Sequence, residues 1–151
     1  MRLAIPAVLF GLAITAVPVC AFGSNNKMPD QQSIDALAAK ANHAPLRDQC
    51  FLYAELVHQM TEFSARQYAA GDVEKSAQLL RQIQELTRKI HLSVARDEKR
   101  MRNAEILLSR TAFRLTGLLH SSSFEDQSLV AQTLADVNQV QTETMLQVFR
   151  K

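Results

Sequence analysis

The chain is 151 residues long, and its 17 Lys plus Arg nearly balance its 15 Asp plus Glu, which gives a formal net charge of +2 at pH 7. This length leaves room for a single domain. Because the net charge is close to zero, it indicates no particular class of partner. Only the distribution of charged residues along the chain can do so.

Residues 1–21 have the layout of a secretory signal peptide. Arg2 gives a positive start, residues 3–19 carry no charge, and Val19 and Ala21 are small enough for the pockets of a signal peptidase. We therefore expect cleavage after Ala21 and export to the periplasm or the medium.

Three alternatives to this cleavage stay open. Gly23 offers a second site for the peptidase. Residues 3–22 are long enough to remain as a membrane anchor. Cys20 could be acylated as in a lipoprotein, although Val19 is larger than the residue usual before such a cysteine. Cleavage would leave only Cys50 in the mature chain, where we expect a buried thiol. The alternative is a disulfide between two chains.

The mature region predicts an all-α fold. No proline follows Pro45, only Gly71 and Gly117 follow residue 23, and good helix formers dominate. We expect a flexible leader at residues 22–32. Residues 33–151 are then a single domain, an antiparallel bundle of three long helices plus a short N-terminal helix.

The first two helices are expected at Ser33–Ala41, with Ser33 as the N-cap, and from about Leu46 to Ala70. Spacings of three and four residues give the second helix one core face. That face consists of Leu46, Cys50, Tyr53, Leu56, Val57, Met60, Phe63, Ser64 and Tyr68.

The third helix is expected to begin at Val73 and to run to about residue 120. Its seam alternates spacings of three and four, which is typical of helices that pack at a shallow left-handed crossing. The seam consists of Leu80, Ile83, Thr87, Ile90, Val94, Asp97, Met101, Ala104, Leu108, Thr111, Leu115 and Leu118. Two alternatives stay open for residues 73–120: one continuous rod, or a bend near Ser93–Asp97.

The last helix is expected to follow a serine turn and to end at about Phe149. Ser123 and Asp126 resemble a capping box at its start. Its predicted core residues are Val130, Leu134, Val137, Met145 and Val148, and its acids are Glu125, Asp126, Asp136 and Glu143.

The stretch at residues 68–77, YAAGDVEKSA, resembles the turn of a tetratricopeptide repeat. In that family two antiparallel helices meet at a Gly-Asp turn, and stacked repeats form a groove for peptides. The resemblance covers little more than the turn, Ser76 replaces the usual alanine, and no second repeat follows. It implies a helical hairpin between the second and third helices.

No catalytic, cofactor-binding or metal site is expected. Glu55 and His58 have the Glu-x-x-His spacing of di-iron bundles, with Glu62 one turn on, but such bundles need two motifs. These side chains lie opposite the predicted core and should face water. No haem attachment motif, phosphate loop or nucleophile elbow is present. A metal- or haem-carrying bundle is therefore the least favoured function, and we expect no enzyme.

A basic stripe is the strongest surface feature. When plotted on one helix, its members fall within about 160°, opposite the seam. They are Arg81, Arg88, Lys89, Arg96, Lys99, Arg100, Arg102, Arg110 and Arg114. The stripe could bind a protein partner, anionic lipid headgroups or a polyanionic glycan. Alternatively, it is a solvated face that the acids of the last helix partly neutralise. Nucleic acid is not expected, because the stripe contains no aromatic residues.

The sequence thus predicts an exported, non-catalytic helical bundle that acts in the cell envelope by protein–protein interaction or self-assembly. Binding of anionic envelope components through the stripe is the alternative.

Overall fold

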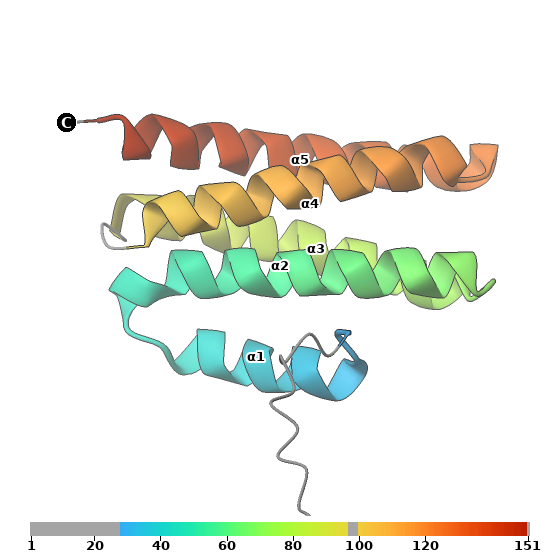
Figure 1. Cartoon of the computed structure of the whole chain (residues 1–151), viewed down its shortest axis with the longest axis horizontal. Coiled ribbons are helices and arrows are strands. Elements are labelled where there is room, and N and C mark those ends of the chain that lie inside the picture. The colour runs from blue at the N-terminus through green and yellow to red at the C-terminus, as the bar shows by residue number, and fades with distance from the viewer. Residues whose placement is uncertain (1–27, 97–99, 151) are drawn as a thin grey trace, which may run out of the picture.

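The computed structural model describes residues 28–96 and 100–150. The predicted signal peptide with its alternatives, most of the leader, Asp97 and Lys99 lie outside this part. In the described ranges all regular structure is helical, which confirms the all-α expectation (Figure 1). The elements are α1 (Gln31–His43), α2 (Leu46–Ala69), α3 (Val73–Ser93), the 3-10 helix η1 (Val94–Arg96), α4 (Met101–Ser121) and α5 (Phe124–Val148).

The expected third helix is two helices, so the described bundle has four long helices and not three. α3 ends at Ser93, and α4 starts at Met101 and runs back antiparallel to α3 (Figure 1). A straight helix over 73–120 would be about 70 Å long, about twice the length of α2 or α5. Folding back lets both halves of the seam pack against the same two neighbours, so the chain takes the bend and not the rod.

The four long helices form a square bundle. α2 packs against α3 and α4, and α5 packs against the same two helices from the other side. α3 and α4 are therefore diagonal to each other, as are α2 and α5. α1 packs on the outer side of α2 and widens the bundle there (Figure 1).

The predicted seam is the core of the bundle. Each of its members that the structure describes is buried, from Leu80 to Leu118. Thr87 and Thr111 are buried with it, and their hydroxyls donate to the carbonyls of Gln84 and Leu107 at 2.7 and 2.8 Å. The spacing of three and four therefore predicted the buried side chains of both α3 and α4.

α2 is buried on more than the one predicted face, because it lies between α1, α3 and α4. The predicted residues Cys50, Val57 and Met60 are buried, whereas Leu46 at the start of the helix is 53% exposed. The further buried residues are Leu52, Ala54, Thr61 and Ala65. The burial of Cys50 confirms the expectation for this thiol, whose Sγ lies 3.9 Å from Met101 Sδ.

The core face of α5 differs in part from the prediction. Val130 and Val137 are buried, but Met145 is 39% exposed. Val140 is buried although it was not among the predicted core residues. The same is true of Thr133 and Thr144, whose hydroxyls donate to carbonyls one turn earlier. Threonines that satisfy their own hydroxyls in this way act as core residues, so a search for aliphatic residues alone passes over them.

Two helix starts are built differently from the predictions. α1 begins inside the predicted leader, because Asp30 and not Ser33 is its N-cap: Asp30 Oδ1 accepts from the amide of Ser33 at 2.8 Å, and Ser33 Oγ accepts from the amide of Asp30 at 3.0 Å. At α5, Tyr68 from the end of α2 replaces the expected capping box. Its hydroxyl accepts from the Ser123 amide at 2.8 Å and donates to Asp126 at 3.0 Å.

The hairpin between α2 and α3 turns at Gly71, which has φ +87°. Asp72 caps α3 by accepting a hydrogen bond from the Lys75 amide at 3.1 Å. Below the turn, the buried hydroxyls of Ser64 and Ser76 lie 2.9 Å apart. Within the described part of the chain, no helix combines the length and the hydropathy needed to cross a membrane.

Candidate functional site

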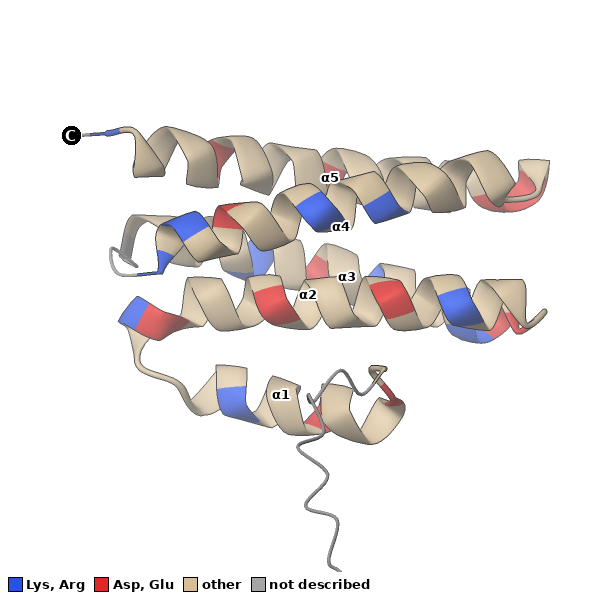
Figure 2. Ribbon diagram, in the orientation of Figure 1, with Lys and Arg blue, Asp and Glu red and all other residues tan. Residues whose placement is uncertain are grey.

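The fold divides the basic stripe between two surfaces. Arg81, Arg88 and Lys89 lie on α3, whereas Arg102, Arg110 and Arg114 lie on α4, with Arg100 just before it and Arg96 in η1 (Figure 2). Because α3 and α4 are diagonal, their outward faces point to different sides of the bundle. The prediction of one continuous stripe assumed a single uninterrupted helix. Because the chain reverses after α3, that assumption does not hold.

Several cations of the stripe are held in local contacts. Arg88 pairs with Glu85 at 2.9 Å, and Arg114 pairs with Glu62 of α2 at 3.3 Å. The Arg100 guanidinium stacks on the Phe51 ring, 3.5 Å from its centroid. Lys89 Nζ donates to Asn42 of α1 at 3.3 Å and lies over the ring of Tyr53. The contacts of Arg114, Arg100 and Lys89 join helices, whereas the Arg88–Glu85 pair lies within α3.

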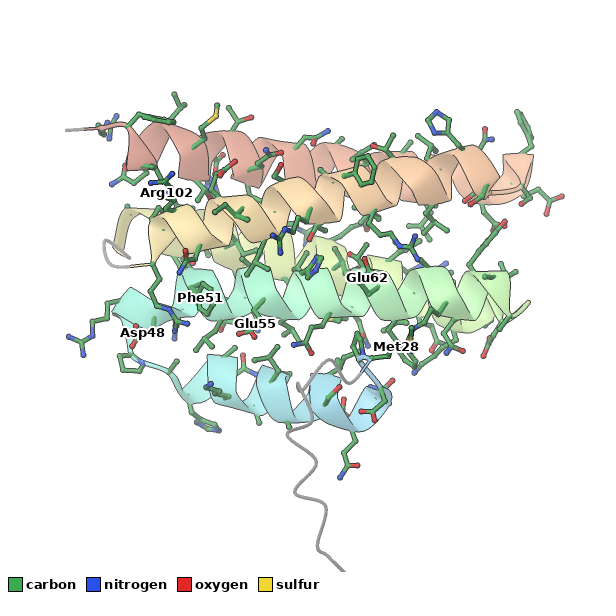
Figure 3. The ribbon with its side chains drawn as sticks, in the orientation of Figure 1. Met28, Asp48, Phe51, Glu55, Glu62 and Arg102 are labelled. Carbon is green, nitrogen blue, oxygen red and sulfur yellow. The ribbon has the colours of Figure 1, made fainter. Side chains whose placement is uncertain are left out.

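The Glu55–His58–Glu62 face of α2 lies against α4 and is half-buried, so the expectation that it faces water is only partly correct (Figure 3). His58 Nδ1 lies 3.3 Å from the hydroxyl of Thr111. Burial lowers the pKa of His58, and Arg110 adds to this, while Glu62 and Glu55 oppose it. No set of three potential metal ligands comes together among the described residues.

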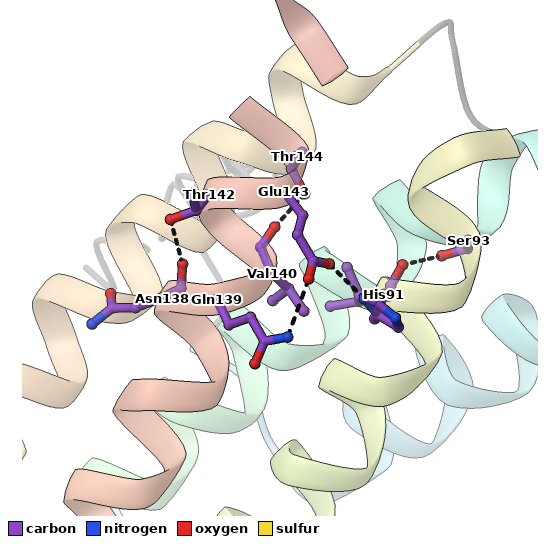
Figure 4. Close-up of polar contacts among 9 residues, drawn as sticks. His91, Ser93, Asn138, Gln139, Val140, Thr142, Glu143 and Thr144 are labelled. Atoms are coloured by element: carbon purple, nitrogen blue, oxygen red, sulfur yellow. Dashed lines mark hydrogen bonds and ion pairs between the residues drawn. The ribbon is translucent and has the colours of Figure 1, made fainter. Parts of the chain in front are cut away.

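A polar groove of about 360 Å³ lies between α3 and α5. Its lining includes Arg88, His91, Gln132, Asp136 and Gln139. At its end His91 Nδ1 pairs with Glu143 at 2.6 Å, and the Gln139 amide donates to the same carboxylate at 3.1 Å (Figure 4). The polar groups at this end are engaged with one another across the two helices, so they strengthen the α3–α5 contact.

Comparison with family models, curated proteins and solved structures found no match for this chain. The surface chemistry of the bundle is therefore the basis for a function.

The outward side of α5 carries large apolar side chains and no charge. Phe124 is 91% exposed at its start, and Leu146 and Phe149 are 63% and 78% exposed at its end. The other exposed residues on the same side of the helix are small or uncharged, among them Ala131, Ala135, Asn138 and Thr142. We call this surface the α5 outer face.

The acids of α5 lie away from this face. At 100° per residue Glu125, Asp136 and Glu143 fall on one flank, about 100–120° from Phe124. That flank is next to α3, where Asp136 lines the groove and Glu143 pairs with His91. A face without charge next to an acidic flank is a surface suited to contact with protein.

The α5 outer face was not predicted from the sequence, because the prediction for the last helix covered only its core side. A signal was available. Phe124 and Phe149 fall about 100–140° away from Val130 and Val137 when α5 is plotted at 100° per residue, which places them outside the core face.

Proposed function

We propose that this chain is a non-catalytic helical bundle of the cell envelope that acts by binding a protein surface through the α5 outer face. The observation that carries the proposal is the exposure of Phe124, Leu146 and Phe149 on one uncharged helix face. Exposed apolar patches bounded by polar residues mark interaction surfaces in soluble proteins.

Aromatic side chains make this face suited to protein contact. Large aromatic residues are enriched at protein interfaces, where charged residues are depleted from the core of the contact. The α5 outer face has this composition. An anionic lipid surface or glycan would instead require cations, and Glu125 and Asp136 lie on the flank of the face.

The hairpin at residues 68–77 supports the same class of function only in a general way. Its resemblance to a tetratricopeptide turn implies a helical hairpin, but the peptide groove of that family needs stacked repeats. We place the binding surface on α5 for this reason.

Export supports a role in the envelope and rests on the signal-peptide pattern of residues 1–21. The mature protein is expected to begin at Phe22. Mass spectrometry of the protein from the export compartment tests this expectation.

Photo-crosslinking in cells that export the chain tests the binding proposal. A benzophenone amino acid replaces Phe149 in one variant and Phe113 in a control variant. Phe113 is 83% exposed but belongs to α4, so the two positions are matched in residue type and exposure. We expect a protein adduct from position 149 and none from position 113. If position 149 gives no adduct, the proposed function fails.

A further inference from the structure

We infer that the partner of the α5 outer face is a second copy of this chain, with the two α5 helices antiparallel about a two-fold axis beside residues 136–137. This inference rests on the proposed function and names its partner. Three properties of the face support a second copy: its register in an antiparallel pair, its lack of charge and its apolar area.

The α5 outer face is self-complementary under such an axis. Residues lie opposite each other in an antiparallel pair when their numbers have the same sum. If Phe124 of one copy lies opposite Phe149 of the other, Ala131 therefore lies opposite Thr142. In the same register Ala135 lies opposite Asn138. Any helix maps onto its own copy about such an axis, and in this register the large apolar residues at the two ends of the face meet each other.

The sizes of the side chains fit this pairing. Ala131 and Ala135 are small and flank the axis, so they let two helices approach closely there, and the separation of packed helices depends on the side chains at the contact. The large rings of Phe124 and Phe149 lie at the two ends of α5. In the antiparallel pair, each end would bring a phenylalanine of one copy against a phenylalanine of the other.

The lack of charge favours a copy of the same chain over a charged partner. In a two-fold contact, a charged residue near the axis would lie close to the same residue of the other copy and repel it. The α5 outer face has no charged residue, so this repulsion does not arise. Equally, it has no charged group to pair with an acidic or basic partner. The acids Glu125, Asp136 and Glu143 remain on the flank, where α3 supplies His91 to Glu143.

The phenylalanines supply a large part of the area that a stable dimer needs. A phenylalanine buries about 150–250 Å² in a contact, so the two from each copy account for about 600–1,000 Å² in total. Biological interfaces bury about 1,000 Å² or more. Leu146 and Met145, which are 63% and 39% exposed, lie beside Phe149 and add to the apolar area.

Crosslinking of single introduced cysteines with a short bis-maleimide tests the arrangement on the purified protein. About the inferred axis, the two copies of residue 135 are three residues apart, or about 4.5 Å along the helices, whereas the two copies of residue 128 are about 25 Å apart. We expect Ala135→Cys to give a covalent dimer, and Ser128→Cys to give at least ten-fold less. The unsubstituted chain is the control for Cys50, which is 0% exposed.

Each other outcome overturns the inference. Equal dimer yields from both variants mean a parallel pair, and no dimer from Ala135→Cys means that the copies do not meet at this face. A third measurement separates this failure from failure of the proposed function. If the in-cell adduct at position 149 contains a different protein, the second copy is excluded while the binding function stands.

Discussion

His58 illustrates how one neighbouring helix changes the chemistry of a side chain. It lies opposite the main core face of α2, yet α4 covers it and brings the Thr111 hydroxyl to 3.3 Å from its Nδ1. Burial lowers the pKa of His58 below its ordinary value of 6.5, so the folded state disfavours the protonated imidazole. A half-buried neutral histidine of this kind makes a fold sensitive to acid.

The free energy of unfolding should fall when the pH drops below the ordinary pKa of His58. In that range the unfolded chain binds the proton more readily than the folded chain, so protonation favours unfolding. His58→Gln, which keeps a neutral polar group near Thr111, should lose less stability between pH 7 and pH 5 than the unsubstituted chain. Urea melts at the two pH values measure this difference.

His120→Gln is the matched control, since His120 is exposed on α4. It should keep the pH dependence of the unsubstituted chain. Equal pH dependence of His58→Gln and the unsubstituted chain would contradict the account of His58.

The two glycines of the helical region have opposite roles at the scale of the element. Gly71 ends α2 with φ +87°, a conformation that costs a side-chain-bearing residue about 1–2 kcal/mol. Gly117 lies inside α4, and a Cβ there would meet nothing within 4 Å. The backbone conformation at residue 71 favours glycine, whereas that at residue 117 does not.

Gly71→Ala should therefore destabilise the protein by about 1 kcal/mol or more, because alanine is strained in the left-handed region. Gly117→Ala should stabilise it by about 0.5–1 kcal/mol, because alanine is the better helix former. Chemical denaturation of the two variants measures both changes. If both substitutions changed the free energy of unfolding in the same direction, the result would contradict either the turn described at Gly71 or the helical conformation described at Gly117.

The helices of this chain follow from local patterns, whereas the break between α3 and α4 was predicted only as one of two alternatives, a bend near Ser93–Asp97. The spacing from Leu80 to Leu118 predicted buried residues on both helices, because a spacing of three and four marks a buried face wherever the helix ends. Neither glycine nor proline marks the end of α3. The available signal was the run of five charged residues at 96–100, which interrupts the apolar seam between Val94 and Met101.

The surface of the whole molecule was less predictable than its core, because it depends on which helices become neighbours. The basic stripe was predicted on one long helix, and the reversal divides it between diagonal helices. The half-burial of His58 depends on the same reversal, since α4 covers it only after folding back. The exposed phenylalanines of α5 depend on no neighbour, and a helical plot alone could have found them.

The mass of the purified protein in solution tests the central claim, that the α5 outer face joins two copies. Light scattering coupled to chromatography should give twice the mass of one chain. Reductant should not change it, because Cys50 is buried. Phe149→Ser should shift the protein to one chain mass by removing a large apolar contact, while Phe113→Ser should leave the dimer intact. A single chain mass for the unsubstituted protein up to its highest soluble concentration, or equal effects of the two substitutions, would contradict the claim.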